Sequence, residues 1–132
     1  MKITADTNVL IRAVLDDDPK QSEMARSILA EAEAIYVPLP VLCEFAWVLR
    51  QGRQLASSEV AAEIRALMNA STVIADRLAV EAGLAVADAG GDFADGVIAH
   101  EGRGMGSETF VSFDKKAVRL LSDAGLSARL LS

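Results

Sequence analysis

The sequence of 132 residues contains a single cysteine, Cys43, and a single histidine. One cysteine excludes an internal disulfide and a cluster of thiolate metal ligands, so a reducing, cytoplasmic setting is expected. No apolar run approaches the roughly 18 residues that span a bilayer, so no membrane segment is expected. The first carboxylate, Asp6, comes too early for the apolar region of a secretory signal peptide.

Aromatic residues and positive charge are also scarce. Aromatics make up 5% of the chain and apolar residues 52%, so the core must consist mainly of Ala, Val, Leu and Ile. This composition is typical of a folded protein, and the length predicts one domain spanning residues 1–132. The formal net charge of −6 argues against a broad basic surface that binds nucleic acid through many phosphates. Bound cations would still allow an acidic protein to act on a polyanion.

Short apolar strands alternate with helices along the chain. Strands are predicted at residues 2–6, 35–37, 72–74, 109–113 and 128–131. Helices are predicted at residues 7–15, 20–33, 39–50, from Ser57 or Ser58 onward, 76–88, 92–101 and 114–123. Strands that alternate with helices pair in parallel and carry helices on both faces. The prediction is a three-layer α/β/α sandwich around a central parallel sheet of four or five strands.

Four carboxylates occur at strand ends or within apolar helix segments: Asp6, Glu44, Asp95 and Asp114. Asp6 and Asp114 each follow a strand directly, and the carboxyl ends of parallel strands share one edge of a sheet. Glu44 comes a few residues after the second strand, whereas Asp95 follows a helix, so periodicity alone does not place Asp95 at this edge. A carboxylate beside the apolar, core-facing side of a helix needs a partner of opposite charge. No arginine partner is obvious nearby, so a bound cation would take this role.

Each carboxylate also has an ordinary structural explanation. Asp6 and Asp114 are placed to cap the helices that follow them, and Glu44 complements the dipole of its helix. Asp92 and Asp95 have the spacing of a capping box. Caps of this kind contribute about 0.5–2 kcal/mol and are common. The occurrence of all four carboxylates together favours a shared site.

Four segments together resemble the motifs of PIN-domain ribonucleases, and most closely those of VapC-type toxins of bacterial toxin–antitoxin pairs. They are Asp6-Thr7-Asn8-Val9-Leu10, residues 42–49, residues 92–99 and Ser112-Phe113-Asp114-Lys115. The segments occur in the family order and extend over nearly the whole chain. Gly96 stands where the family often has alanine.

This resemblance implies a parallel-sheet α/β/α fold, dependence on Mg²⁺ or Mn²⁺, and endonucleolytic cleavage of RNA by metal-activated water. It also implies a homodimer and a small antitoxin protein that blocks the activity. By motif, Asp6 and Asp95 would be the principal metal ligands, and Asp114 and Glu44 would complete the acidic site directly or through waters. The supporting polar residues would be Thr7, Asn8 and Ser112.

Other functions are open from the residues alone. A phospho-receiver-like signalling module would have a similar size and an acidic crevice, but it needs a lysine after its last strand and a second acid beside Asp6. A haloacid-dehalogenase-type phosphatase would need an aspartate where Asn8 stands. A PIN fold that has lost catalysis and only binds partners is a third alternative, against which the four acids argue.

A tryptophan, a cysteine and four arginines lie outside this predicted acidic site. Trp47 is predicted to lie in the core rather than to form a platform for stacking bases. Cys43 has no histidine placed to activate it, so it is predicted to be a small buried residue. Candidates for contact with phosphate or with an antitoxin are Arg12, Arg50, Arg53 and Arg103, and the sequence does not choose among them.

Overall fold

The computed structural model describes residues 1–132 and contains seven α-helices, a π-helical segment and five short strands. In chain order these are β1 (Lys2–Thr4), α1 (Thr7–Val14), α2 (Pro19–Glu31), β2 (Ala34–Tyr36), α3 (Leu39–Trp47), η1 (Val48–Gly52), α4 (Ser57–Asn69), β3 (Val73–Ile74), α5 (Arg77–Asp88), α6 (Phe93–Gly104), β4 (Phe110–Ser112), α7 (Lys115–Asp123) and β5 (Ala128–Leu130). The predicted α/β architecture with parallel strands is confirmed. No helix combines the length and hydrophobicity that crossing a bilayer would require.

The first three strands form one parallel sheet with β2 in the centre. Ile35 of β2 lies opposite Ile3 of β1 on one side and Val73 of β3 on the other. Ile35 and Val73 are buried, which explains why these short apolar segments adopt extended structure. Since all three strands are parallel, their carboxyl ends share one edge, and Asp6 follows β1 at this edge.

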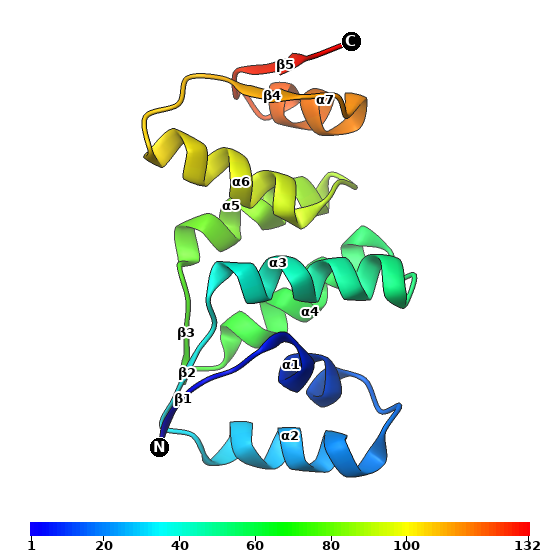
Figure 1. Cartoon of the computed structure of the whole chain (residues 1–132), viewed down its shortest axis with the longest axis vertical. Coiled ribbons are helices and arrows are strands. Elements are labelled where there is room, and N and C mark those ends of the chain that lie inside the picture. Colours follow the sequence, from blue (N-terminus) through cyan, green and yellow to red (C-terminus); the bar gives the residue numbers. More distant parts are fainter.

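The last two strands form a second sheet, so the predicted single sheet of four or five strands is not observed. β4 pairs in parallel with β5, with Val111 opposite Arg129, and neither strand pairs with β1. In Figure 1 this pair and α7 lie at the top of the view, and α3, α5 and α6 lie between them and the first sheet. The outer edges of β1 and β4 therefore have no strand partner.

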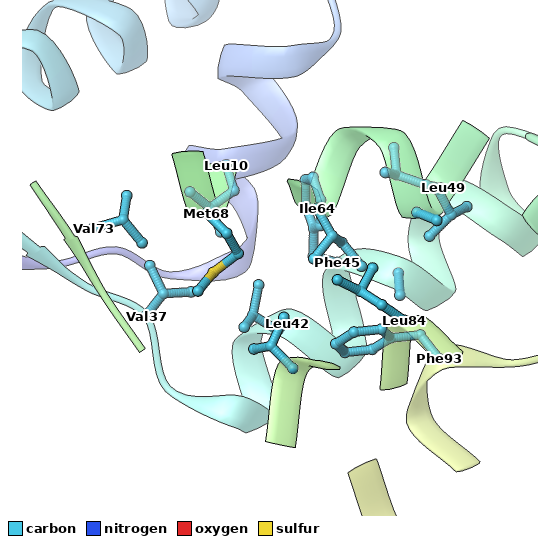
Figure 2. Packing of buried hydrophobic residues seen from close by; sticks show 14 of the residues in the cluster. Leu10, Val37, Leu42, Phe45, Leu49, Ile64, Met68, Val73, Leu84 and Phe93 are labelled. Atoms are coloured by element: carbon cyan, nitrogen blue, oxygen red, sulfur yellow. The ribbon is translucent and has the colours of Figure 1, made fainter. Parts of the chain in front are cut away.

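Two hydrophobic cores explain this separation. The larger core is centred on α3 and η1, where Leu42 and Phe45 of α3 and Leu49 of η1 are fully buried, and Figure 2 shows Phe45 packed near Ile64 of α4. The smaller core joins Leu120 and Leu121 of α7 to one buried residue each of α5 and α6, Val86 and Ala99. Burial of the apolar face of α7 against α5 and α6 thus positions the β4–β5 pair.

Aspartates cap the helices at the predicted positions, with small differences elsewhere. The carboxylate of Asp6 accepts a hydrogen bond from the Val9 amide at 3.1 Å, and the carboxylate of Asp92 accepts one from the Ala94 amide at 3.1 Å. The predicted serine cap of α4 is wrong, because Ala56 occupies the cap position. The predicted helix at 39–50 changes to π-helical geometry after Trp47.

Candidate active site

One cavity of about 200 Å³ brings together carboxylates from two elements. Asp92 and Asp95 belong to the start of α6, and Asp114 caps α7. Three other polar side chains in the lining are Arg50, Gln51 and Lys116, and Trp47 and Ala117 complete its apolar part. The cavity therefore carries three carboxylates and two positively charged side chains.

The pKa of Asp95 is raised to about 6 in this cavity. Burial is the main cause, and the negative charges of Asp92 and Asp114 add to it. The predicted capping box is not formed, since the Asp92 carboxylate caps α6 while no hydrogen bond occupies the side chain of Asp95. Asp95 is thus a half-buried carboxylate without a compensating donor, which is unfavourable unless a cation or a proton balances it.

Asp114 is held by two backbone amides and by the side chain of Ser112. Its carboxylate accepts hydrogen bonds from the amides of Lys116 and Ala117 at 2.9 and 3.1 Å. Its own amide donates to the hydroxyl oxygen of Ser112 at 3.0 Å. Ser112 therefore orients the turn between β4 and α7, and with it the Asp114 carboxylate.

A second, shallower cavity of about 300 Å³ holds the other two carboxylates. Asp6 follows β1, and Glu44 lies on α3, which packs against α1. Thr7 and Asn8, the first residues of α1, line the same cavity, with Thr7 buried and Asn8 exposed. Both carboxylates are exposed, because the cavity opens widely to solvent.

The predicted meeting of all four carboxylates is not observed. The structure pairs Asp6 with Glu44 and Asp95 with Asp114, and no three acidic, histidine or cysteine side chains are grouped closely enough to hold a metal ion. The reason is that the strands form two separate sheets. Because β4 does not pair with β1, Asp114 at the start of α7 lies beside α6 and away from Asp6. Both cavities border α3, which carries Glu44 in one cavity and Trp47 in the other.

The sequence matches the family model of the PIN domain over residues 3–121. The chain belongs to the PIN-domain family. A comparison with curated proteins finds no match. Family membership confirms the resemblance at the level of the PIN domain, and it agrees with the parallel α/β fold. Because the chain is a PIN domain, the alternative of a phospho-receiver-like module is no longer supported.

PIN domains are typically metal-dependent nucleases, and the carboxylates of this PIN domain are donors of the type that a hard divalent cation prefers. Mg²⁺ prefers carboxylate oxygens together with several retained waters. Asp95 and Asp114 supply two such carboxylates in one cavity, and the raised pKa of Asp95 reflects a negative field that a cation would relieve.

Five polar or aromatic residues of this cavity are not among the predicted site residues: Trp47, Arg50, Gln51, Asp92 and Lys116. Trp47, predicted to be in the core, is 58% exposed. Arg50 is one of the four arginines among which the sequence does not choose, and Asp92 was predicted only as a helix cap. A signal for Trp47 was present, because a residue two positions after the buried Phe45 points about 200° away on a helix. That spacing places Trp47 on the outer face of α3.

Proposed function

We propose that this PIN domain is an Mg²⁺- or Mn²⁺-dependent endoribonuclease and the VapC-type toxin of a toxin–antitoxin pair. The observation that carries the proposal is that Asp92, Asp95 and Asp114 line one cavity of a PIN domain. Like charges in a half-buried cavity are costly, and proteins keep them where a metal is bound or a proton is moved. The alternative, a PIN domain that only binds partners, has no need of this arrangement.

Asp95 and Asp114 would hold the principal ion, and Asp6 and Glu44 in the second cavity along α3 would complete the acidic site. A bound divalent cation supplies a water of lowered pKa and neutralises charge on the phosphate oxygens during hydrolysis. Asp95 must lose its proton to act as a ligand, and the amides beside Asp114 keep that carboxylate in place. Thr7, Asn8 and Ser112 would position the acidic residues.

A homodimer is supported by exposed surface. The accessible surface is 7690 Å² for a chain of 14.0 kDa, whereas a compact monomer of that mass exposes roughly 6,700 Å². The excess of about 1,000 Å² is comparable to what one partner contributes to a stable interface. The unpaired edges of β1 and β4, and the exposed Val111 and Phe113, are the surfaces that a second copy would cover.

Cleavage of a structured RNA by the purified protein tests the enzymatic part of the proposal. We expect cleavage with Mg²⁺ or Mn²⁺, none with EDTA, and a loss of roughly a hundredfold or more in Asp6→Asn and Asp95→Asn. The control is Glu23→Gln on the exposed face of α2, which should retain activity. Cleavage that survives both EDTA and the two aspartate substitutions would exclude the mechanism.

The biological part of the proposal has its own test. A toxin requires a partner, so a short open reading frame beside the gene should encode a DNA-binding antitoxin. Co-purification of that product with this chain, and inhibition of cleavage by it, are the expected results. The RNA substrate is to be identified by mapping cut ends in cells that express the toxin without the antitoxin.

A further inference from the structure

The outer edges of β1 and β4 carry backbone groups that can pair with each other. The amide of Ala5, directly after β1, donates to a carbonyl of β2 at 3.1 Å, and the carbonyl of Ser112 accepts from the amide that follows β5 at 2.8 Å. Alternate residues of a parallel strand bond to opposite neighbours. The backbone groups of Thr4 therefore face the outer edge of β1, and those of Val111 and Phe113 face the outer edge of β4. A parallel ladder between these edges places Thr4 opposite Ser112.

This register also aligns two of the predicted site residues. Asp6 comes two residues after Thr4, and Asp114 comes two residues after Ser112. Neighbouring strands lie about 4.8 Å apart, so the two aspartates would follow adjacent strands at the same edge of one sheet. Within a single chain they line two separate cavities. Pairing of β1 with β4 would therefore join the two acidic cavities.

The exposure of side chains favours the same register. In the first sheet, Ile3 packs against the larger core, whereas Tyr36 and Ile74 on the other face are 38% and 47% exposed. In the second sheet, Phe110 packs against the smaller core, whereas Val111 is 55% exposed. Side chains alternate between the faces of a strand, so with Val111 opposite Ile3 the covered face of each sheet continues into the bare face of the other. The joined sheet would carry helices on both faces, as an α/β/α sandwich requires.

A second copy can provide this pairing without breaking any contact of the protomer. In one chain α3, α5 and α6 lie between the two sheets (Figure 1), and Leu120 and Leu121 join α7 to α5 and α6. The β4 strand could reach β1 of its own chain only by giving up this core. In a two-fold dimer, β4 of each copy pairs with β1 of the other. The excess exposed surface of roughly 1,000 Å² matches the about 800 Å² that one partner contributes to a standard interface.

We propose that the active site is shared between two copies of this chain, through parallel pairing of β4 of one subunit with β1 of the other. Asp95 and Asp114 of one subunit then act together with Asp6 and Glu44 of the partner subunit. The proposal rests on the nuclease function and names what the second copy contributes to it. The dimer contains two such sites, and neither is complete in a single chain. Together the four carboxylates supply the oxygen donors that a hard divalent cation prefers.

Disulfide trapping tests the pairing without RNA or metal. One copy carries Ile3→Cys and the other, extended by a size tag, carries Val111→Cys, and both carry Cys43→Ala. After co-expression and oxidation we expect a covalent mixed dimer, because opposite residues of adjacent strands have Cα atoms about 4.8 Å apart, within the range of a disulfide. In the control, Met24→Cys on the exposed side of α2 replaces Ile3→Cys and should give no mixed dimer. Since the two cysteines belong to different chains, closure of β4 onto β1 within one chain also gives no product and overturns the proposal.

Mixed dimers of inactive variants test the shared site. Asp6→Asn and Asp114→Asn are each expected to be inactive alone, and asparagine preserves the helix cap at both positions. Their co-expression should restore about a quarter of the parent cleavage rate, since half of the dimers are mixed and each mixed dimer retains one intact site. The control combines Asp95→Asn with Asp114→Asn. Both changes fall on the same side of the shared site, so every site lacks a carboxylate and no cleavage returns.

The outcomes separate this proposal from the nuclease function. Absence of the covalent mixed dimer overturns the pairing, and absence of complementation in a protein whose parent cleaves RNA overturns the shared site. A parent that forms the covalent dimer but cleaves no RNA rejects the nuclease function, and Mn²⁺ calorimetry then decides whether the site is shared. Val111→Asp should be monomeric and bind Mn²⁺ about tenfold more weakly than the parent, whereas Met24→Asp should match the parent. Equal affinity of Val111→Asp and the parent would reject the shared site.

Discussion

Glu44 and Trp47 lie three residues apart on α3 and line two different cavities. Residues three apart on a helix are neighbours on one face, about 5–6 Å apart at their Cβ atoms. The Asp6–Glu44 pair and the Asp95–Asp114 pair therefore open beside one another along α3. A nucleic acid bound along this face of α3 would extend past both acidic pairs, and the separated carboxylates would then share one substrate.

Replacing Asp95 with asparagine should stabilise the metal-free protein at neutral pH. The pKa of Asp95 is about 6 in the folded state and 3.8 in the unfolded reference, so its ionisation opposes folding. The stabilisation that the protonated Asp95 carboxyl provides is fully present below about pH 4. It is lost as the pH rises through 6 and the carboxyl ionises in the folded protein. We expect Asp95→Asn to gain about 1 kcal/mol at pH 7, allowing for solvent screening of a half-buried group, and to gain nothing at pH 4.

Urea unfolding in EDTA at the two pH values measures this difference. The control is Glu23→Gln, which removes an exposed carboxylate from α2 and should change neither value. Equal stability of Asp95→Asn and the parent at pH 7 would mean that Asp95 carries no electrostatic penalty. The argument for a cation at this position would then lose its support.

Addition of Mg²⁺ should make the parent protein more stable than Asp95→Asn, the reverse of the order in EDTA. An ion that binds the folded state stabilises it by about 1.4 kcal/mol at a concentration ten times its Kd. The parent should show this rise in thermal unfolding temperature, and Asp95→Asn and Asp114→Asn should show a much smaller one. An increase of the same size in Asp95→Asn would place the bound ion elsewhere. Thermal shift assays with Mg²⁺ and Mn²⁺ provide the measurement without any RNA.

Much of the fold could be predicted because its signals are local. Alternating strands and helices, and aspartates such as Asp6 and Asp92 at helix N-termini, depend on residues within one or two turns. The pairing of strands could not be predicted in this way. Whether β4 joins β1 or only β5 depends on contacts far apart in the chain, here on α7 packing against α5 and α6 through Leu121.

The four motifs name Asp6, Glu44, Asp95 and Asp114, and their role in a shared acidic site stays a prediction. Their grouping into two cavities could not be predicted, because it depends on the same distant contacts that split the sheet. Trp47 was missed for another reason. The sequence around it is apolar, which favours burial, whereas the helical spacing of Leu42, Phe45 and Leu49 turns Trp47 outward.

Gly96 should not tolerate alanine, although alanine favours helices. A Cβ atom at Gly96 would lie 2.8 Å from the Gly83 Cα and still closer to the Ala82 carbonyl, both of which are backbone atoms of α5. Alanine gains up to about 1 kcal/mol of helix propensity, whereas overpacking costs about 1–3 kcal/mol. We expect a net loss of about 1–2 kcal/mol in urea unfolding and weaker metal binding at the adjacent Asp95.

A matched substitution on the same helix makes this prediction specific. At Gly102 of α6 the nearest atom to a new Cβ is 3.8 Å away, so alanine fits without displacement. Gly102→Ala should therefore stabilise the protein by up to about 1 kcal/mol. If both substitutions changed stability in the same direction, close packing of α5 on α6 would not be the reason for glycine at position 96.

Truncation of Leu121 should release the C-terminal unit formed by β4, α7 and β5 without unfolding the main core. Leu121 is 1% exposed and belongs to the four-residue core that joins α7 to α5 and α6. A buried Leu→Ala substitution costs about 2–5 kcal/mol, and here the loss falls on a small core that is distinct from the one around Phe45. In Leu121→Ala, amides of β4, α7 and β5 should exchange with solvent faster, while those of α3 remain protected.

Arg119→Ala on the exposed side of α7 is the control and should leave the exchange pattern unchanged. Because Asp114 caps α7, the released unit should also lose Mg²⁺-dependent stabilisation. Equal acceleration in α3 and α7 would instead show that the two cores unfold as one.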